Sequence, residues 1–264
     1  MKLNLIAYSF LGNVRKKNED GFLIYGFKGD TLISSDSYSE EKIYRTTNTA
    51  SDQLFLALID GMGGMGDGDI ARDVILQSFE TSLTTYSNEE FLKNYQNLFQ
   101  VANKFLLNVK KTNNYRDMGA VCTTALFKQK ELIVSHLGDT RLYQIRNGKL
   151  HCLTNDHTYI NQMLLTKKIS KEEAANHPWR NMVMKSLGFE QNVAPDFLTI
   201  STEPGDIYLL FSDGVFNELE DEIIEFEFNK QVTLYDKTSF LLERQKNTFC
   251  NDNYTGIICE IVEN

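Results

Sequence analysis

The chain has little proline, a single tryptophan and no long apolar run. Its three prolines are Pro178, Pro195 and Pro204, and no proline-rich or glycine/serine-rich stretch divides its 264 residues. We therefore expect residues 1–264 to form a single domain, large enough to bury a core without disulfide or metal staples. The opening MKLNLIAYSF is too short and too mixed for a signal peptide, and no segment reaches the length that spans a membrane.

Cysteine is also scarce, which limits both disulfides and soft-metal sites. The four cysteines, Cys122, Cys152, Cys250 and Cys259, form no C-x-x-C pair and do not have zinc-site spacing. Cys122 and Cys259 lie inside apolar runs and read as small buried side chains. This usage indicates a reducing compartment, so we expect a cytoplasmic protein with no membrane partner.

The chain has no basic excess. It carries 27 Lys and Arg against 36 Asp and Glu, for a net charge of -9 and a pI near 5.0. Binding to a nucleic-acid backbone needs a basic surface, so this balance argues against nucleic acid as a partner. The acidic excess is compatible with a solvated surface and with carboxylates gathered at one site.

Strand-like segments are the commonest pattern along the chain. The Asn147-Gly148 pair lies between two of them and predicts a hairpin turn. Segments rich in β-branched and aromatic residues predict strands at 3–10, 21–27, 54–59, 131–137, 141–146, 206–212 and 255–262.

Helical periodicity appears in four places, at 69–83, 89–111, 158–189 and 235–247. In the third, Ser170 and Glu173 form a capping box and Gly188 closes the last helix. The first two helices follow one another with no strand between them, so the order is not an alternation of strands and helices. It favours an α+β fold with antiparallel sheets covered by helices. The residues expected on the inner face of 89–111 are Phe91, Tyr95, Leu98, Ala102, Phe105 and Val109.

Carboxylates recur at the ends of predicted strands. A single Asp-Gly at such a position is usually a turn, but several together would repel one another and need a cation to stay ionised. Hard divalent cations prefer oxygen ligands, and two of them sharing an aspartate would activate a water and clamp a phosphoryl oxygen. The carboxylates are Glu19, Asp20, Asp60, Asp139, Asp213 and Asp252.

The glycine-rich turn after Asp60 allows a competing interpretation. Gly61, Gly63 and Gly66 satisfy G-x-G-x-x-G, the dinucleotide-binding fingerprint. That motif needs a second strand ending in an acidic residue, whereas here a helix is followed by another helix. Asp60 would also place a negative charge beside a pyrophosphate, so a metal site is favoured over a phosphate cradle.

Short motifs in order along nearly the whole chain resemble those of the metal-dependent serine/threonine protein phosphatases of the PP2C type (the PPM family), particularly their compact bacterial members. The stretches that carry this resemblance are VRKKNED, LIDGMGG, SHLGDTRLYQIRNGKLHCLTNDHT, ISKEEAANHPWRNMVMKSLG, LLFSDGV and NDNYTGIICEIV. The family fold is a four-layer αββα sandwich with two antiparallel β-sheets flanked by helices, which agrees with the predicted element order.

The resemblance also implies roles for individual residues. Arg15 would bind the substrate phosphate, a task suited to a bidentate guanidinium. The ions would be Mn²⁺ or Mg²⁺, two of them and a weaker third. Asp60 would bridge two ions, and the Gly61 carbonyl would ligate one of them. Asp213 and Asp252 would complete the site of the second ion, and Glu19 and Asp20 would hold metal-bound waters. Asp139 would help to hold the third ion.

Three positions depart from the family pattern. Met62 stands where some members carry a histidine proposed as general acid, so protonation of the leaving group would fall to a metal-bound water. Asn217 stands where an aspartate is common, and a neutral amide would weaken the third ion. The stretch MGAVCTTAL is looser than the family's M-G-T-T block. His136 and His157 lack the partners of a nucleophilic triad, and we expect structural roles for both.

The implied activity is hydrolysis of phosphoserine and phosphothreonine in proteins by a water that the metal pair activates. A phosphoprotein substrate and an opposing Ser/Thr kinase are the implied partners. The chain has no C-x₅-R motif, so a cysteine-based phosphatase mechanism is not expected. Two alternatives stay open: a regulatory or binding module of the same fold with little activity, which Asn217 favours, and a hydrolase of another phosphate ester.

Overall fold

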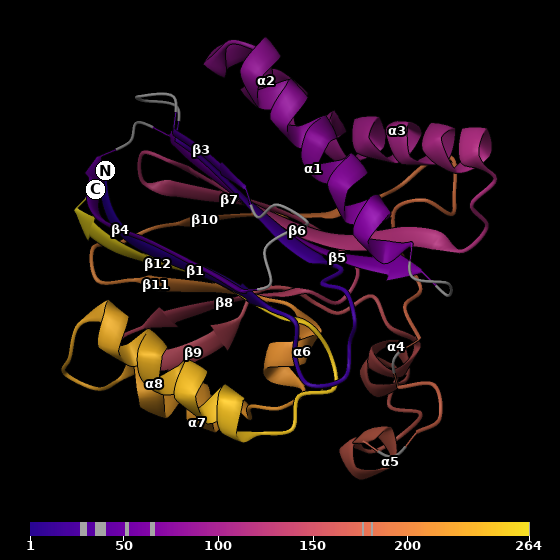
Figure 1. Ribbon diagram of the computed structural model, residues 1–264. Coiled ribbons are helices and arrows are strands. Elements are labelled where there is room, and N and C mark those ends of the chain that lie inside the picture. Colours follow the sequence, from indigo (N-terminus) through magenta and orange to yellow (C-terminus); the bar gives the residue numbers. More distant parts are fainter. Residues whose placement is uncertain are drawn as a thin grey trace.

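Two stacked antiparallel sheets, with helices on both outer faces, make up the architecture of the computed structural model (Figure 1). The structure describes residues 1–26, 31–34, 41–50, 53–63, 67–175, 177–180 and 182–263, so Gly66 of the glycine-rich turn lies outside it. The predicted α+β fold, a four-layer αββα sandwich, is confirmed.

Each sheet has six strands. The first runs in the order β4 (Glu41–Ala50), β1 (Lys2–Phe10), β12 (Tyr254–Glu263), β11 (Ile207–Phe211), β8 (Arg141–Arg146) and β9 (Lys149–Cys152). The second runs in the order β10 (Asp196–Ser201), β7 (Glu131–Leu137), β6 (Met118–Lys128), β5 (Gln53–Gly63), β2 (Asp20–Gly26) and β3 (Thr31–Ser34).

The apolar run of β5 is buried on both faces, which explains why it does not alternate with polar residues. Successive side chains point to opposite faces of a strand. Leu54, Leu56 and Leu58 therefore enter the core between the two sheets. Phe55, Ala57 and Ile59 enter a second core beneath the helices that cover this sheet.

Helices cover both outer faces of the sandwich (Figure 1). The second sheet is covered by α1 (Gly68–Thr85), α2 (Asn88–Asn94), the 3₁₀ turn η1 (Tyr95–Asn97) and α3 (Leu98–Asn113). The first sheet is covered by α6 (Asp213–Phe216), α7 (Asp221–Phe228) and α8 (Leu234–Asn247). Two short helices, α4 (Tyr159–Leu165) and α5 (Lys171–Ala175), lie beside the sandwich. No helix among the described residues is long and apolar enough to cross a membrane.

The prediction of one helix over 89–111 is wrong, because η1 interrupts it. A 3₁₀ turn advances 120° per residue against 100° in an α-helix, so three residues shift the inner face by about 60°. Phe105, expected inside, is 55% exposed, whereas Leu106 is fully buried. The inner face of α3 therefore runs through Phe99, Ala102 and Leu106.

The prediction of helix across 158–189 is only partly right. The capping box forms, with Ser170 N donating to Glu173 Oε2 at 2.8 Å and Glu173 N to Ser170 Oγ at 3.2 Å. The described residues between 177 and 189 contain no helix, because this segment pairs with β6 through Ala120 and Leu187. Gly188 therefore closes no helix; its φ of +93° lets the chain pass Met118 O closely.

The hairpin prediction is confirmed. Asn147 and Gly148 have φ of 52° and 74°, the left-handed values that a type I′ turn requires. They join β8 to β9 in antiparallel register.

Candidate metal centre

Two carboxylates of the second sheet face each other at the strand ends. Asp20, the first residue of β2, pairs directly with Asp60 of β5. Residues opposite each other in an antiparallel ladder have Cβ atoms about 4.5–5.5 Å apart on the same face. Asp20 is 3% exposed, and its Oδ2 accepts a hydrogen bond from Ser212 Oγ at 2.6 Å. Ser212 belongs to the other sheet's end, so this bond joins the two sheets at the carboxylates.

The first sheet brings two further carboxylates to the same edge. Asp213 follows β11 and Asp252 precedes β12, and these strands are neighbours. Ser212 fixes their spacing, because its backbone N–H donates to Thr255 O at 3.0 Å and its Oγ accepts from Thr255 N at 2.9 Å. The register of two adjacent strands therefore places Asp213 beside Asp252.

The loop between β1 and β2 adds Arg15 and Glu19. Arg15 Nη2 lies 2.6 Å from Asp252 Oδ2, and Arg15 Nη1 lies 3.5 Å from Glu19 Oε2. Glu19 is 9% exposed, and its Oε1 accepts a hydrogen bond from Gly68 N at 3.2 Å, at the start of α1. A carboxylate at a helix N-terminus is stabilised by the exposed N–H groups there. The Arg15 side chain is 43% exposed, so its guanidinium faces solvent as well as the carboxylates.

Gly61 lets α1 begin directly against the end of β5. A Cβ at this position would lie 2.0 Å from Gly68 O, a distance that no side chain tolerates. Gly61 N also donates to Glu19 O at 3.0 Å. The glycine therefore serves a close approach of three backbone segments, which bring Asp60 and Glu19 together.

Asp139 lies in the turn that carries the chain from β7 in one sheet to β8 in the other. It lines a cleft of about 690 Å³ together with Asp213 and Asp252. Lys171 and Arg180 line the same cleft from the α4–α5 side. The carboxylates are thus open to a substrate between the sandwich edge and the α4–α5 region.

Burial and mutual repulsion hold these carboxylates in an unfavourable state. Burial raises the pKa of Asp60 well above its ordinary value, and the charges of Asp20 and Asp213 raise it further. Burial raises the pKa of Asp139 to about 7, with Asp213 as the next contributor. The pKa values of Asp20, Asp213 and Glu19 are also raised, with burial the first cause in each case.

The donor set fits hard divalent cations. Every donor is a carboxylate or carbonyl oxygen, which Mg²⁺ and Mn²⁺ prefer, and neutralising the repulsion would restore ionised carboxylates. Among the residues that the structure describes, no three Asp, Glu, His or Cys side chains are already arranged so that they could hold one metal ion. Asp252 instead pairs with Arg15, and Asp213 Oδ2 accepts from Asn217 Nδ2 at 3.2 Å.

The two histidines of this region have structural partners. Their rings stack at 4.8 Å between centroids. His136 Nδ1 bonds Thr123 Oγ1 at 2.8 Å, and His157 Nδ1 accepts from Gly138 N at 3.0 Å. These bonds hold the turn that leads into Asp139, in line with the structural roles expected from the sequence.

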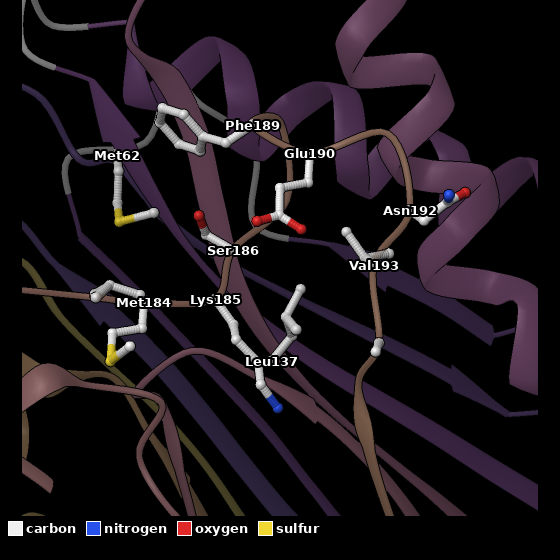
Figure 2. A pocket seen from close by; sticks show the side chains of 11 residues that line it. Met62, Leu137, Met184, Lys185, Ser186, Phe189, Glu190, Asn192 and Val193 are labelled. Atoms are coloured by element: carbon white, nitrogen blue, oxygen red, sulfur yellow. The ribbon is translucent and has the colours of Figure 1, made fainter. Parts of the chain in front are cut away.

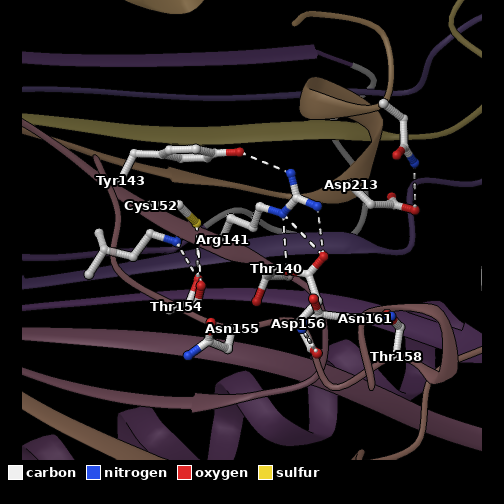
Figure 3. A network of polar contacts seen from close by, with 12 residues as sticks. Thr140, Arg141, Tyr143, Cys152, Thr154, Asn155, Asp156, Thr158, Asn161 and Asp213 are labelled. Carbon is white, nitrogen blue, oxygen red and sulfur yellow. Dashed lines mark hydrogen bonds and ion pairs between the residues drawn. The ribbon is translucent and has the colours of Figure 1, made fainter. Parts of the chain in front are cut away.

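The ion pair between Arg141 and Asp156, beside the cleft, was not predicted from the sequence (Figure 3). Arg141 donates two hydrogen bonds to Asp156, from Nη2 to Oδ2 at 2.7 Å and from Nε to Oδ1 at 3.0 Å. The guanidinium also lies 3.8 Å from the centre of the Phe216 ring. Asp156 O in turn accepts from Asn161 Nδ2 at 2.8 Å, which ties α4 to the pair. The two residues are 15 apart in the chain, and no spacing rule predicts such a pair.

Asn253 anchors the loop that carries Arg15 and Glu19. It is 2% exposed. Its Oδ1 accepts from Glu19 N at 2.8 Å, and its Nδ2 donates to Leu11 O at 2.8 Å and to Lys17 O at 3.1 Å. The residue next to Asp252 thus fixes the backbone of the opposite end of the chain.

A buried arginine supports the same loop from below. Arg72 of α1 is 1% exposed, and its Nη1 donates to Asn18 O and, at 3.1 Å, to Asp20 O. Gly21 makes room for it, since a Cβ there would lie 2.4 Å from Arg72 Cδ. Arg72 is therefore a positioning residue that holds the backbone on both sides of Glu19. Helical periodicity does not distinguish it from a surface arginine.

We predict that Arg72→Met lowers the free energy of unfolding by about 2–3 kcal/mol, because two buried carbonyls lose their donor. It should also weaken Mn²⁺ binding, since Glu19 and Asp20 lose their support. Urea denaturation and calorimetric Mn²⁺ titration measure the two effects, with exposed Arg116→Met as the matched control. Unchanged Mn²⁺ affinity in a folded Arg72→Met protein would limit Arg72 to a structural role.

Known proteins match the chain over most of its length. The family model described as Protein phosphatase 2C matches residues 28–247. Protein phosphatase PhpP of Streptococcus pneumoniae is 30% identical over 241 residues, which cover 89% of this chain and 95% of that protein.

Solved structures agree with this match. Serine/threonine phosphatase Stp1 from Staphylococcus aureus has a TM-score of 0.82 at 28% identity, covering 98% of this chain and 95% of that one. The catalytic domain of the serine/threonine protein phosphatase PstP in complex with 2 manganese ions has a TM-score of 0.76 at 25% identity, covering 99% and 100%. The chain therefore belongs to the protein phosphatase 2C family of metal-dependent enzymes and is a serine/threonine protein phosphatase.

Proposed function

We propose that this phosphatase hydrolyses phosphoserine and phosphothreonine in proteins with water activated by two Mn²⁺ or Mg²⁺ ions at the sandwich edge. The carrying observation is the meeting of Asp20 and Asp60 from one sheet with Asp213 and Asp252 from the other. When bound, two such metal ions lower the pKa of water and neutralise charge on the phosphoryl oxygens. The phosphoprotein substrates are expected to be products of an opposing Ser/Thr kinase.

The residues that would hold the ions are those with oxygen donors at the strand ends. Asp60 would serve both ions, since the charges of Asp20, Asp213 and Asp252 all raise its pKa and it is therefore close to each of them. Asp213 and Asp252 would serve the second ion, and the Gly61 carbonyl would serve the first. Glu19 and Asp20 would accept hydrogen bonds from metal-bound water at the same edge. Asp139 is the proposed ligand of a weaker third ion, where the neutral Asn217 adds no charge.

Arg15 is the proposed phosphate-binding residue. Its guanidinium contacts two of the carboxylates, at 2.6 Å to Asp252 and 3.5 Å to Glu19, which supports this role. A planar guanidinium binds a phosphate through two parallel hydrogen bonds, so it would orient the phosphoryl group for in-line attack. The thioether of Met62 carries no titratable proton, so the leaving alkoxide takes its proton from water.

We predict that hydrolysis of p-nitrophenyl phosphate requires Mn²⁺ or Mg²⁺. EDTA should abolish turnover, and excess Mn²⁺ should restore it, because the proposed nucleophile is a water whose pKa the bound ions lower. Turnover that persists after EDTA and dialysis would remove the metal-activated water from the mechanism.

Asp60→Asn should separate activity from stability. We expect turnover to fall about 100-fold or more, because the bridging ligand is lost. The raised pKa of Asp60 means that its ionised form destabilises the metal-free fold near pH 7, so an amide should raise the metal-free melting temperature by about 2–4 °C. Calorimetric melts with EDTA or Mn²⁺ test this prediction.

The control for Asp60→Asn is Asp117→Asn, an exposed aspartate outside the cluster, which should change neither turnover nor melting. Asp213→Asn should lose activity as Asp60→Asn does. A fully active Asp60→Asn or Asp213→Asn enzyme would show that the proposed ligand set is wrong.

Arg15→Ala should raise KM for a phosphopeptide about tenfold or more at saturating Mn²⁺, with kcat less affected, because a charge-assisted contact to the phosphate is lost. Arg15→Lys, which keeps the charge but not the fork, should fall between. Steady-state kinetics measure both. If KM is the same in Arg15→Ala and wild type, Arg15 does not bind the phosphate.

A further inference from the structure

A mainly apolar pocket of about 490 Å³ shares no lining residue with the polar cleft (Figure 2). Met62, Met184 and Phe189 lie together on one side of it. Met184 is 50% exposed and Phe189 53% exposed, so large apolar side chains line an open hollow. The remaining lining residues are Leu137, Val183, Lys185, Ser186, Glu190, Asn192, Val193 and Ala194.

The pocket is tied to the carboxylates through two strands. Met62 lies two residues after Asp60 in β5, whose pairing with β6 has no register shift through Gly63. Alternation therefore puts both side chains on the same face, with about 7 Å between their Cα atoms. Leu137 ends β7 two residues before Asp139, so the same short turn contributes to the pocket and to the polar cleft.

The two hollows differ in chemistry. The polar cleft is lined by carboxylates with Lys171 and Arg180, whereas the pocket has a mainly apolar wall. Its nearest cation is engaged, since Lys185 Nζ lies 3.2 Å from Asp196 Oδ1 and 3.2 Å from His157 Nε2. A hollow of this size and lining suits one or two aliphatic or aromatic side chains.

We propose that this pocket binds an apolar side chain of the phosphoprotein substrate, on one side of the phosphorylated residue. The proposal rests on the proposed function, because it takes the phosphate to bind at Asp60 and Arg15. An extended peptide advances about 3.3–3.6 Å per residue. The Cα separation of Asp60 and Met62 then places the apolar residue about two or three positions from the phosphoresidue.

The asymmetry of the two hollows makes the proposal specific. The apolar pocket shares no lining residue with the polar cleft that holds Asp139, Asp213 and Asp252, so a substrate chain bound at these carboxylates would meet the pocket on one side. Only one side of the phosphoresidue should therefore prefer an apolar neighbour. Burial of Met184 and Phe189 by that neighbour supplies the gain, because apolar area removed from water stabilises a complex in proportion to its extent.

The test is a walk of leucine through an alanine-rich phosphothreonine peptide, from three residues before the phosphothreonine to three after it. At saturating Mn²⁺, we expect kcat/KM to rise about tenfold when leucine stands two or three positions away on one side, and not on the other. Equal kcat/KM for every leucine position would overturn the proposal.

Variants assign the preference to this pocket. Met184→Gln and Phe189→Gln should each remove most of the leucine preference while leaving p-nitrophenyl phosphate and the all-alanine phosphopeptide unaffected. Phe105→Gln, an equally exposed phenylalanine of α3 at 55%, is the matched control and should keep the preference. Phe189 also packs over Gly119, so Phe189→Gln could fail to fold. In that event Met184→Gln alone tests the proposal.

Three outcomes distinguish failure of the subsite from failure of the proposed function. If both glutamine variants keep the preference of the wild type, the pocket is not the subsite and the proposal fails. If the wild type hydrolyses p-nitrophenyl phosphate but shows no preference, the proposed function stands and the subsite falls. If Mn²⁺ supports hydrolysis of neither p-nitrophenyl phosphate nor any phosphopeptide, the proposed function itself fails.

Discussion

Repulsion among the carboxylates gathered at one edge of the sandwich is the constraint on which the arrangement of this molecule depends. Asp20 and Asp60 face each other across one sheet, and Asp213 and Asp252 are brought beside them by the other. The rest of the edge offsets this cost. Ser212 donates to Asp20, Arg15 pairs with Asp252, and the N–H of Gly68 at the start of α1 donates to Glu19. Burial of the side chains in three hydrophobic cores stabilises the fold and offsets the unfavourable free energy of this carboxylate cluster.

Much of this edge was accessible from the sequence. Acidic residues beside strongly apolar strands predict that carboxylates gather where strand ends meet. Asp213 directly follows β11 and Asp252 lies two residues before β12, whereas Asp60, expected to end its strand, lies inside β5, which continues to Gly63. The α+β architecture followed from two consecutive helices between groups of strands. Motif resemblance added Arg15 and Glu19, whose loop has no periodic pattern to read. The structure places Arg15 beside both Glu19 and Asp252.

Other features depend on three-dimensional packing and could not be read from spacing. One 3₁₀ turn rotated the inner face of α3 and exposed Phe105. Strand β6 escaped notice because it is buried on both faces and uses small residues such as Gly119 and Ala120, which carry little β propensity. Arg72 looks like a surface arginine until Gly21 is seen to leave it room. Each case is tertiary context overriding a local pattern.

The bonds of Asn253 have a consequence for the order of events during synthesis. They join Glu19 and Lys17 to a residue more than 230 positions later. Strand β12, which follows Asn253, also fills the place between β1 and β11 in the first sheet. A growing chain on the ribosome therefore holds Arg15, Asp60 and Asp213 without the strand and the amide that align them. These residues are aligned only after β12 has been made, so a chain that stops before Asn253 lacks the amide that holds the backbone of Glu19 and Lys17.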